Sequence, residues 1–393
     1  MKKRQARVIA NYLPQFHPIP ENDEWWGKGF TEWTNVAKAR PLFRGHYQPH
    51  IPADMGFYDL RLPEVREAQA HLAREAGIEG FCYWHYWFGG GKRLLERPFQ
   101  EVLASGKPDF PFCLGWANHD WTNKTWTRRS AFSQEKILMK QTYSEEDYVL
   151  HFQALLGAFR DKRYLTVDGK PLFMIFEPKL FPDIQAFIAI WRELARQNGL
   201  PGIHLVGAQS NVSFRSADGQ VQLPRLDEAP SLYQAILDMG FDAVNSRGIT
   251  RAEVAVKGRL NRFVRRTWDR FFNVSLLDRY RYDRIAQHMF VPEDRWENVY
   301  PTLVSNWDRS PRCGRKAAIY VDSTPQHFET ALCKALDLVR EKPFEHRILF
   351  VQSWNEWGEG NHLEPDLRYG RGYLDVLAKH LWADGNAAGE ASR

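Results

Sequence analysis

The sequence predicts an α/β fold, a (β/α)8 TIM barrel, from three observations. Eight short apolar runs rich in β-branched and aromatic residues recur along the 393 residues, as expected of buried strands. Helical patterns separate most of them, and this alternation, repeated eight times, is typical of the barrel. The alternative is a doubly wound open sheet that binds a nucleotide, and it needs a glycine-rich loop after its first strand. Here that strand runs into Leu13, Pro14 and Gln15, which favours the barrel.

The eight runs are expected to be the barrel strands in chain order. They span residues 7–13, 78–83, 110–116, 171–176, 203–208, 241–245, 299–305 and 348–353. Four segments between them follow the 3.6-residue period of an amphipathic helix. They span residues 63–76, 145–159, 183–195 and 330–339. Ser144 and the acidic residues after it resemble a capping box, and Pro325 after Thr324 suits a first helical turn.

We expect one domain over residues 1–393, with a long insertion between strands 6 and 7 at about residues 246–298. The segment 251–290 holds ten Lys or Arg against four Asp or Glu. Within it, the apolar residues of 260–272 share one face of a predicted helix and arginines populate the others. We favour a helix that packs on the barrel with a solvated basic face. The alternative is peripheral contact with an anionic membrane or glycan.

The charge, the tryptophan content and the lack of long apolar runs limit the classes of function that the chain can have. The net charge of +5 comes from the basic segment, so the remaining surface is close to neutral and general nucleic-acid binding is excluded. Fifteen tryptophans exceed what a core of this size needs, and indole faces stack well on sugar rings. No apolar run approaches the roughly 18 residues of a membrane span, and no signal-peptide core follows the basic N-terminus. The four cysteines lack paired spacing. We therefore expect a cytoplasmic protein, at most peripheral to the inner membrane.

Chemistry in such a barrel sits at the C-terminal ends of the strands, and there the sequence is rich in aromatic, amide and histidine residues. The candidate substrate-binding residues are Tyr12, Gln15, His17, Trp26, Trp33, Tyr83, Trp84, His85, Trp116, Asn118, His119, Glu177, Asn306, Trp307, Trp354 and Asn355. Because these clusters follow nearly every strand, they predict one convergent polar pocket. Taken singly, His85 and His119 equally suit a core, and Glu177 suits a helix cap. A metal site from the two histidines and Asp120 lacks a paired spacing, so we expect neither a metal nor a cofactor.

The most informative stretch is S-W-N-E-W-G-E-G at 353–360, directly after the last predicted strand. It places Glu356 and Glu359 three residues apart, beside tryptophans and glycines. These are the parts needed to hold a sugar ring and act on its glycosidic bond. We predict that both glutamates are catalytic. The alternative is a hydrogen-bonded turn that closes the barrel.

Five motifs carry a family resemblance over nearly the whole chain. They are N-Y-L-P-Q-F-H at 11–17, G-F-T-E-W at 29–33, G-F-C-Y-W-H-Y-W at 80–87, L-G-W-A-N at 114–118 and the 353–360 stretch. The chain resembles the WbsX-type, glycoside hydrolase family 99-like proteins of bacterial surface-polysaccharide loci. The resemblance implies a (β/α)8 fold. Related hydrolases are retaining endo-α-mannosidases and mannanases, whereas some members are labelled glycosyltransferases by context.

The resemblance also implies separate roles for the two glutamates. Glu356 deprotonates the sugar's own 2-hydroxyl, which attacks C1 and gives a 1,2-anhydro intermediate. Glu359 protonates the leaving oxygen. The reaction needs O2 trans to the leaving group, as in α-mannose- and α-rhamnose-like sugars, and the two carboxyl groups must have pKa values that are pushed apart.

Three functions stay open. The first is a retaining glycosidase or transglycosylase that acts on an α-mannose- or α-rhamnose-like bond of a bacterial surface polysaccharide. The second is a glycosyltransferase of O-antigen (lipopolysaccharide) or capsule biosynthesis. The basic insertion favours it, and the lack of a D-x-D motif argues against it. The third is a non-catalytic glycan-binding barrel, for which the glutamates would be dispensable.

Overall fold

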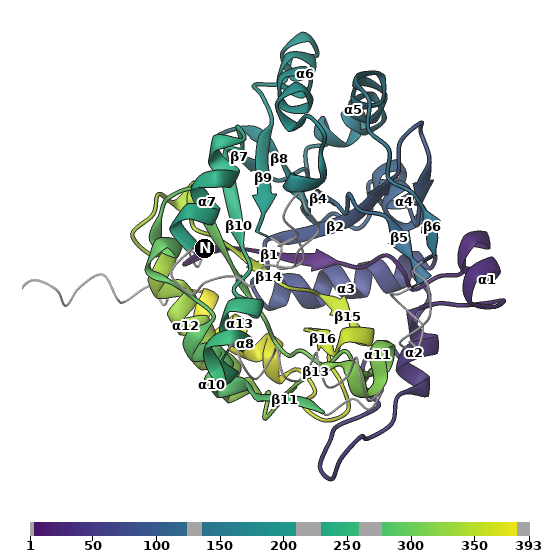
Figure 1. The fold of residues 1–393 in the computed structure, drawn as a ribbon, viewed down its shortest axis with the longest axis vertical. Coiled ribbons are helices and arrows are strands. Elements are labelled where there is room, and N and C mark those ends of the chain that lie inside the picture. Colours follow the sequence, from purple (N-terminus) through teal and green to yellow (C-terminus); the bar gives the residue numbers. More distant parts are fainter. Residues whose placement is uncertain (1–3, 124–135, 210–228, 259–276, 383–393) are drawn as a thin grey trace, which may run out of the picture.

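The structure is a computed structural model that describes residues 4–123, 136–209, 229–258 and 277–382. Eight parallel strands form a closed ring, because each pairs with the next and the last pairs with the first (Figure 1). In ring order they are β1 (Arg7–Tyr12), β2 (Gly80–Trp87), β4 (Phe112–Trp116), β8 (Lys170–Ile175), β9 (His204–Ala208), β10 (Ala243–Ser246), β12 (Val299–Leu303) and β14 (Ile348–Val351). The predicted (β/α)8 TIM barrel is confirmed.

All eight predicted runs coincide with barrel strands. Every residue of β1, β4, β9, β12 and β14 is buried, as expected where a parallel sheet is covered on both faces. Strand β2 extends four residues past the predicted end at 83. The extension forms an antiparallel hairpin with β3 (Arg93–Leu94), and glycines with positive φ at 89–91 make its turn.

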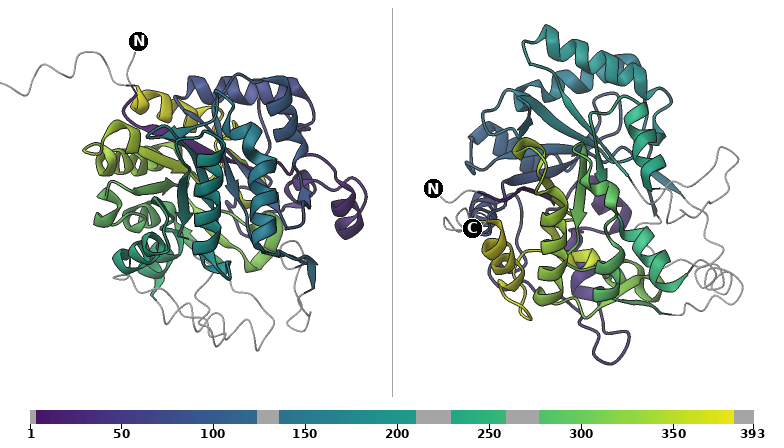
Figure 2. Two further views of the ribbon diagram at one scale, coloured as in Figure 1. Left: turned by 90° about the horizontal axis from the view of Figure 1, so that it is seen from above. Right: turned by 90° about the vertical axis from the view of Figure 1, so that its left-hand side faces the viewer.

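Helices surround the strands (Figure 2). They are α1 (Pro20–Trp26), α2 (Glu32–Lys38), α3 (Pro63–Glu75), α4 (Arg97–Ser105), α5 (Glu145–Phe159), α6 (Ile184–Gln197), α7 (Ala229–Asp238), α8 (Ile249–Lys257), α10 (Tyr282–His288), α11 (Ser310–Cys313), α12 (Pro325–Val339) and α13 (Gly372–Leu381). Helix α5 has the predicted bounds, and the Ser144 side chain accepts from the Asp147 amide. Helix α12 begins before the predicted residue 330, because the Thr324 hydroxyl caps it by accepting from the His327 amide.

The segment between β10 and β12 contains α8, β11 (Asp278–Arg281) and α10. Strand β11 pairs in parallel with β13 (Ala318–Val321), outside the barrel sheet. The helix predicted at 260–272 lies outside the described residues, and the single-domain organisation stays a prediction. Over the ranges that the structure describes, every helix is too short or too polar to cross a membrane.

Several further short elements connect the barrel strands and helices. They are β5 (Trp121–Thr122), β6 (Ile137–Met139), β7 (Thr166–Val167), β15 (Asn355–Glu356), the 3-10 turn η6 (Trp357–Glu359) and β16 (Asn361–His362). Turn η6 packs against both α2 and α11. These contacts bring segments from both ends of the chain onto the loop after β14 (Figure 1).

Candidate active site

Glu356 and Glu359 lie on the loop that follows β14, at the end of β15 and in η6. Two glycines shape this loop. Gly360 has a φ of +58°, a left-handed conformation that glycine adopts without strain. At Gly358 a Cβ atom would collide with Oε1 of Glu32. Gly358 therefore lets the loop backbone approach α2, and Gly360 lets it turn against Asp308.

Arg312 of α11 connects the two glutamates. Its Nε and Nη2 each donate to one oxygen of Glu32 at 3.0 Å. Nη2 also donates to Oε1 of Glu356 at 2.5 Å, and Nη1 lies 2.7 Å from Oε1 of Glu359. The Arg312 side chain is 6% exposed. One buried guanidinium thus binds three carboxylates, and these charge-assisted contacts fix the relative positions of Glu356 and Glu359.

The two glutamates differ in charge environment. Burial, strengthened by the neighbouring Glu359 and Glu32 and opposed by Arg312, raises the pKa of Glu356 to about 7. Burial would also raise the pKa of Glu359, but Arg309 and Arg312 outweigh it and hold that pKa below its ordinary value. Nε of Arg309 lies 2.9 Å from Oε1 of Glu359. Near neutral pH the site therefore combines a readily protonated Glu356 with an ionised Glu359.

An aromatic wall stands beside this pair. The Phe176 ring, directly after β8, lies 5.4 Å from the Trp84 ring and 5.6 Å from the His119 ring. Trp84 and His119 are only partly buried. Tyr86 lies close enough to Glu356 that its pKa is raised by burial and by that carboxylate. Aromatic faces at a barrel mouth suit the C–H face of a sugar.

Arg247 follows β10 on the same side. Its guanidinium carbon lies 4.9 Å from the centre of the Phe176 ring, and its Nε donates to Oε1 of Gln352 at 3.3 Å. Burial lowers the pKa of Arg247, whereas Glu177, Glu359 and Glu356 act to raise it. No carboxylate of the described residues forms an ion pair with Arg247. The site thus contains a cation whose donors are mostly unused.

Buried polar side-chain atoms without a hydrogen-bond partner among the described residues include four from four different strand ends. They are Nε2 of Gln15, Nδ1 of His119, Oε1 of Gln209 and Oδ1 of Asn306. The four residues follow β1, β4, β9 and β12 respectively. Buried polar atoms are nearly always hydrogen-bonded, so orphaned donors and acceptors around one barrel mouth fit a polar ligand with several hydroxyls.

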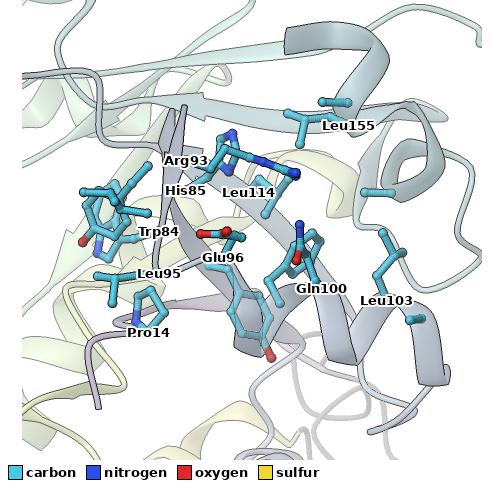
Figure 3. Close-up of a pocket in the computed structure, with 17 residues that line it drawn as sticks. Pro14, Trp84, His85, Arg93, Leu95, Glu96, Gln100, Leu103, Leu114 and Leu155 are labelled. Atoms are coloured by element: carbon cyan, nitrogen blue, oxygen red, sulfur yellow. The ribbon is translucent and has the colours of Figure 1, made fainter. Parts of the chain in front are cut away.

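Four predicted binding residues instead pack against helices. They are Tyr12, Tyr83, His85 and Trp116, whose contacts lie on α3, α4, α5 and α6. The Tyr12 hydroxyl donates to Gln69 at 2.6 Å, and Nε2 of His85 lies 2.9 Å from Nε2 of His151. Tyr83 and His85 also line a cavity of about 210 Å³ next to α4 and α5 (Figure 3). Trp84 and Tyr86 line the same cavity, whereas Glu356 and Glu359 do not.

Other predicted residues hold the framework of the site. The Asn355 side chain donates to the Leu13 carbonyl and accepts from its amide, which ties the loop to β1. The Asn118 side chain makes the same two-way connection to the Glu177 backbone. Nε1 of Trp33 donates to a backbone carbonyl, and the Trp354 side chain is fully buried. These residues position the loops rather than face a ligand.

The last predicted residues are dispersed. The buried His17 has its Nδ1 2.9 Å from the Pro14 carbonyl oxygen. Trp26 lies in the peripheral helix α1 and contacts Phe30 (Figure 1), and Trp307 is partly buried after β12. The carboxylate of Glu177 is buried and acts on Arg247 electrostatically.

Several residues of the site were not selected from the sequence. They are Glu32, Tyr86, Phe176, Gln209, Arg247, Arg309, Arg312 and Gln352. Glu32 lies within the G-F-T-E-W motif, and Gln352 directly precedes the 353–360 stretch, so proximity to motifs could have indicated these two. The three arginines have no local signal, because their partners come from distant parts of the chain.

Comparisons with known proteins agree with this architecture. The chain is 37% identical over 380 residues to "Uncharacterized protein WxcX" of two Xanthomonas campestris pv. campestris strains. The alignment covers 96% of this chain and 50% of those proteins, so the chain spans about half their length.

Two solved structures have a similar fold. One is a "Glycoside hydrolase-like protein" with 15% identity and a TM-score of 0.57, aligned over 98% of this chain and 96% of that one. The other is a GH99 endo-α-mannosidase from Bacteroides thetaiotaomicron with 14% identity and a TM-score of 0.51, aligned over 96% of each chain. At such identities the likeness concerns the fold alone. The family model described as "Glycosyltransferase WbsX" matches residues 8–377, and the chain therefore belongs to the WbsX family.

Proposed function

We propose that this chain is a carbohydrate-active enzyme that acts with retention on an α-mannose- or α-rhamnose-like glycosidic bond of a bacterial surface polysaccharide. Glu356 and Glu359 are the catalytic pair in this proposal. The observation that carries it is the shared Arg312, which holds both carboxylates in one place while their pKa values are displaced in opposite directions. Two carboxyl groups with separated pKa values are what acid–base work on a glycosidic bond requires.

The proposed roles reverse those implied by the resemblance. Glu359, held by Arg309 and Arg312, is the ionised base that takes the proton of the 2-hydroxyl. O2 then attacks C1, the bond from C1 to the leaving oxygen breaks, and Glu356 gives its proton to that oxygen. Water or an acceptor hydroxyl opens the 1,2-anhydro ring in a second step, which returns both protons and retains the configuration at C1.

Substrates with different leaving groups test these roles of Glu356 and Glu359. A glycosyl fluoride needs little help from a general acid, so Glu356→Gln should keep much of its activity on the fluoride while losing polysaccharide cleavage. Glu359→Gln should lose both activities, because no base then activates O2. The opposite pattern supports the roles implied by the resemblance. Equal loss on both substrates in the two variants contradicts a division of labour.

The substrate would bind between the aromatic wall and the orphaned polar atoms. In this arrangement Trp84 stacks on a sugar ring, and Gln15, His119, Gln209 and Asn306 hydrogen-bond to hydroxyls. Alanine at Trp84 should raise KM more than it lowers kcat, since stacking binds ground state and transition state alike.

Glycosyl transfer is a second candidate function, favoured by Arg247 and by the description of the WbsX family as glycosyltransferases. A guanidinium with unused donors binds phosphate in a bidentate manner, and nucleotide-sugar or lipid-linked donors carry phosphate. Under this alternative the same glutamates serve the acceptor hydroxyl and the leaving phosphate.

One experiment separates cleavage from transfer. The protein is incubated with purified surface polysaccharide of its host, and separately with nucleotide sugars and a lipid acceptor, and products are followed by mass spectrometry. Oligosaccharide release that disappears in both glutamine variants supports cleavage, and sugar transfer from the nucleotide donor overturns it. Unchanged glycan binding by the variants, with no turnover by the wild type, supports the non-catalytic barrel. Contact of residues 251–290 with an anionic surface and a cytoplasmic location stay predictions.

A further inference from the structure

A second polar cluster lies directly behind the catalytic loop. Five titratable side chains meet there: His46, His50, Asp308, His362 and Asp366. All five side chains are nearly inaccessible, with Asp308 2% and Asp366 3% exposed. The cluster adjoins the active site, because the Asp308 amide donates to the Glu359 carbonyl at 2.7 Å. Neither the family motifs nor the proposed reaction uses these groups.

Hydrogen bonds fix the protonation of the histidines. The Leu42 amide donates to Nδ1 of His46, so that ring is neutral and donates from Nε2 to Oδ2 of Asp308. Nδ1 of His362 donates to the Glu364 carbonyl at 2.9 Å, which leaves Nε2 as an acceptor for His50.

The two buried aspartates of this cluster accept hydrogen bonds from neutral donors of the described residues. Asp308 receives hydrogen bonds from His46, Gln48 and the Ser310 amide, all of them neutral donors. Across the described ranges, neither Asp308 nor Asp366 has a Lys or Arg at ion-pair distance. Buried charges in proteins are normally paired or coordinate a metal. A divalent cation would neutralise this cluster.

Three of the five residues present converging ligand atoms. One ligand atom each from His50, His362 and Asp366 lie within 4.8 Å of one another. Oδ1 of Asp366 is held by the amides of Arg368 and Tyr369, and Oδ2 lies 3.9 Å from Nε2 of His362. A carbonyl-bound histidine and an anchored carboxylate are the supports that orient metal ligands in proteins.

We propose that His50, His362 and Asp366 bind one divalent transition-metal ion of the zinc class. Two imidazoles and a carboxylate suit zinc, and a water molecule completes a tetrahedral site. The two imidazole nitrogens are 2.9 Å apart. They must separate to roughly 3.3 Å to sit about 2.0–2.1 Å from one zinc ion. The His50 proton moves from Nδ1 to Nε2 in the process, so the ring stays neutral.

The position of the site gives the metal a structural role. His362 pairs with Asn355 across the β15–β16 hairpin, and its ring stacks on Trp357 at 3.7 Å. Glu356 is the next residue of that hairpin. A metal bound to His50 would therefore fix the catalytic loop to the segment after α2. This inference does not depend on whether the enzyme cleaves or transfers.

The test is metal content, measured on tag-free protein. Wild type is loaded with zinc, dialysed extensively against metal-free buffer and analysed by inductively coupled plasma mass spectrometry. We expect about one equivalent of zinc, and visible absorption bands of tetrahedral cobalt when Co²⁺ replaces it. His50→Ala and Asp366→Asn should each lower the zinc content at least tenfold. The exposed His71 supplies the control, and His71→Ala should retain the full equivalent.

Thermal unfolding gives an independent readout on folded wild-type protein. Removal of the metal with a chelator should lower Tm by at least about 5 °C, and added zinc should restore it, because a ligand that binds only the folded state stabilises it. Asp366→Asn should be folded by circular dichroism but unresponsive to zinc. Wild type with less than about one tenth of an equivalent and no Tm response overturns the proposal. Equal zinc content in wild type and both variants overturns it too, as adventitious binding.

Discussion

Nη1 of Arg312 lies 2.7 Å from Oε1 of Glu359, and the rest of the guanidinium is occupied by Glu356 and Glu32. Arg312 therefore does more than neutralise one acid. It sets the distance between the two catalytic candidates, and it makes the pKa of each depend on the other. Glu32, whose carboxyl group lies against Gly358, acts through Arg312 as a positioning residue.

Loss of Arg312 should destabilise the fold strongly. Arg312→Ala leaves three buried carboxylates without their common cation, and removal of one partner of a buried ion pair typically costs about 3–5 kcal/mol. Glu32→Gln in the same chain should recover part of the loss, since one uncompensated charge disappears. Denaturant unfolding of the two single variants and the double variant measures the coupling. Arg315→Ala, at an exposed arginine three residues on, is the control. Strict additivity in the cycle contradicts the shared role of Arg312.

The pH dependence of activity should reflect Glu356. Its pKa is raised to about 7 by burial and by the neighbouring carboxylates, and as the general acid it must be protonated. kcat/KM should therefore fall tenfold for each pH unit well above 7. With a glycosyl fluoride, which bypasses the acid, this alkaline limb should vanish. An unchanged limb on the fluoride assigns the limb to another group.

The free energy of unfolding should also depend on the ionisation of Glu356, and it should fall between about pH 4.5 and 7. Glu356 ionises near pH 4.5 in the unfolded chain and near pH 7 in the folded one. Between these values the folded state holds a proton that the unfolded state has lost, so the free energy of unfolding falls as the pH rises. Glu356→Gln abolishes this loss. Denaturant unfolding at pH 4.5 and 7.5 should show the variant gaining on wild type at the higher pH. A difference that is constant with pH contradicts the raised pKa.

Arg247 should select substrates that carry an acidic group. Its donors reach Gln352 and no carboxylate at ion-pair distance in the described ranges, so a carboxylate or phosphate on the substrate can use them. Arg247→Met should lower kcat/KM on an acidic polysaccharide roughly 10- to 100-fold, the value of one charge-assisted hydrogen bond pair. On the same polysaccharide after carboxyl reduction the variant and wild type should differ little. An equal loss on both substrates shows that Arg247 serves only to balance Glu177 and the catalytic pair.

The barrel was predictable because each of its strands has a signal within a short stretch of the sequence. Parallel strands covered on both faces require continuous apolar runs, and all eight runs became strands. The closeness of Glu356 and Glu359 was predictable for the same reason, since they share one short motif. The three arginines were not, because nothing near Arg247, Arg309 or Arg312 in the sequence distinguishes them from the chain's other 50 basic residues. Their partners are brought to them only by folding.

Strand β2 shows a second limit of the sequence. Side chains of a strand alternate between its two faces, but a strand buried on both sides gives no polar–apolar alternation that marks the inner face. The sequence therefore cannot tell which residues of the run from Tyr83 to Tyr86 face the ligand side of the strand. In the structure Tyr83 and His85 contact helices α4 and α5, whereas Trp84 contacts Phe176 and Tyr86 lies close enough to Glu356 that this carboxylate raises its pKa.

His85 and His119 were equivalent candidates in the sequence, and they should now behave differently. His85→Ala leaves the buried His151 without its hydrogen-bond partner, an unsatisfied group that costs about 1–3 kcal/mol. It should lower Tm while leaving KM within about twofold of wild type. His119 has a buried Nδ1 without a partner and a ring beside Phe176. His119→Ala should raise KM several-fold with little change in Tm, because only the substrate complex loses a hydrogen bond. Thermal unfolding and steady-state kinetics of both variants test these two placements. A raised KM in His85→Ala alone would contradict the placement of the His85 side chain against α5.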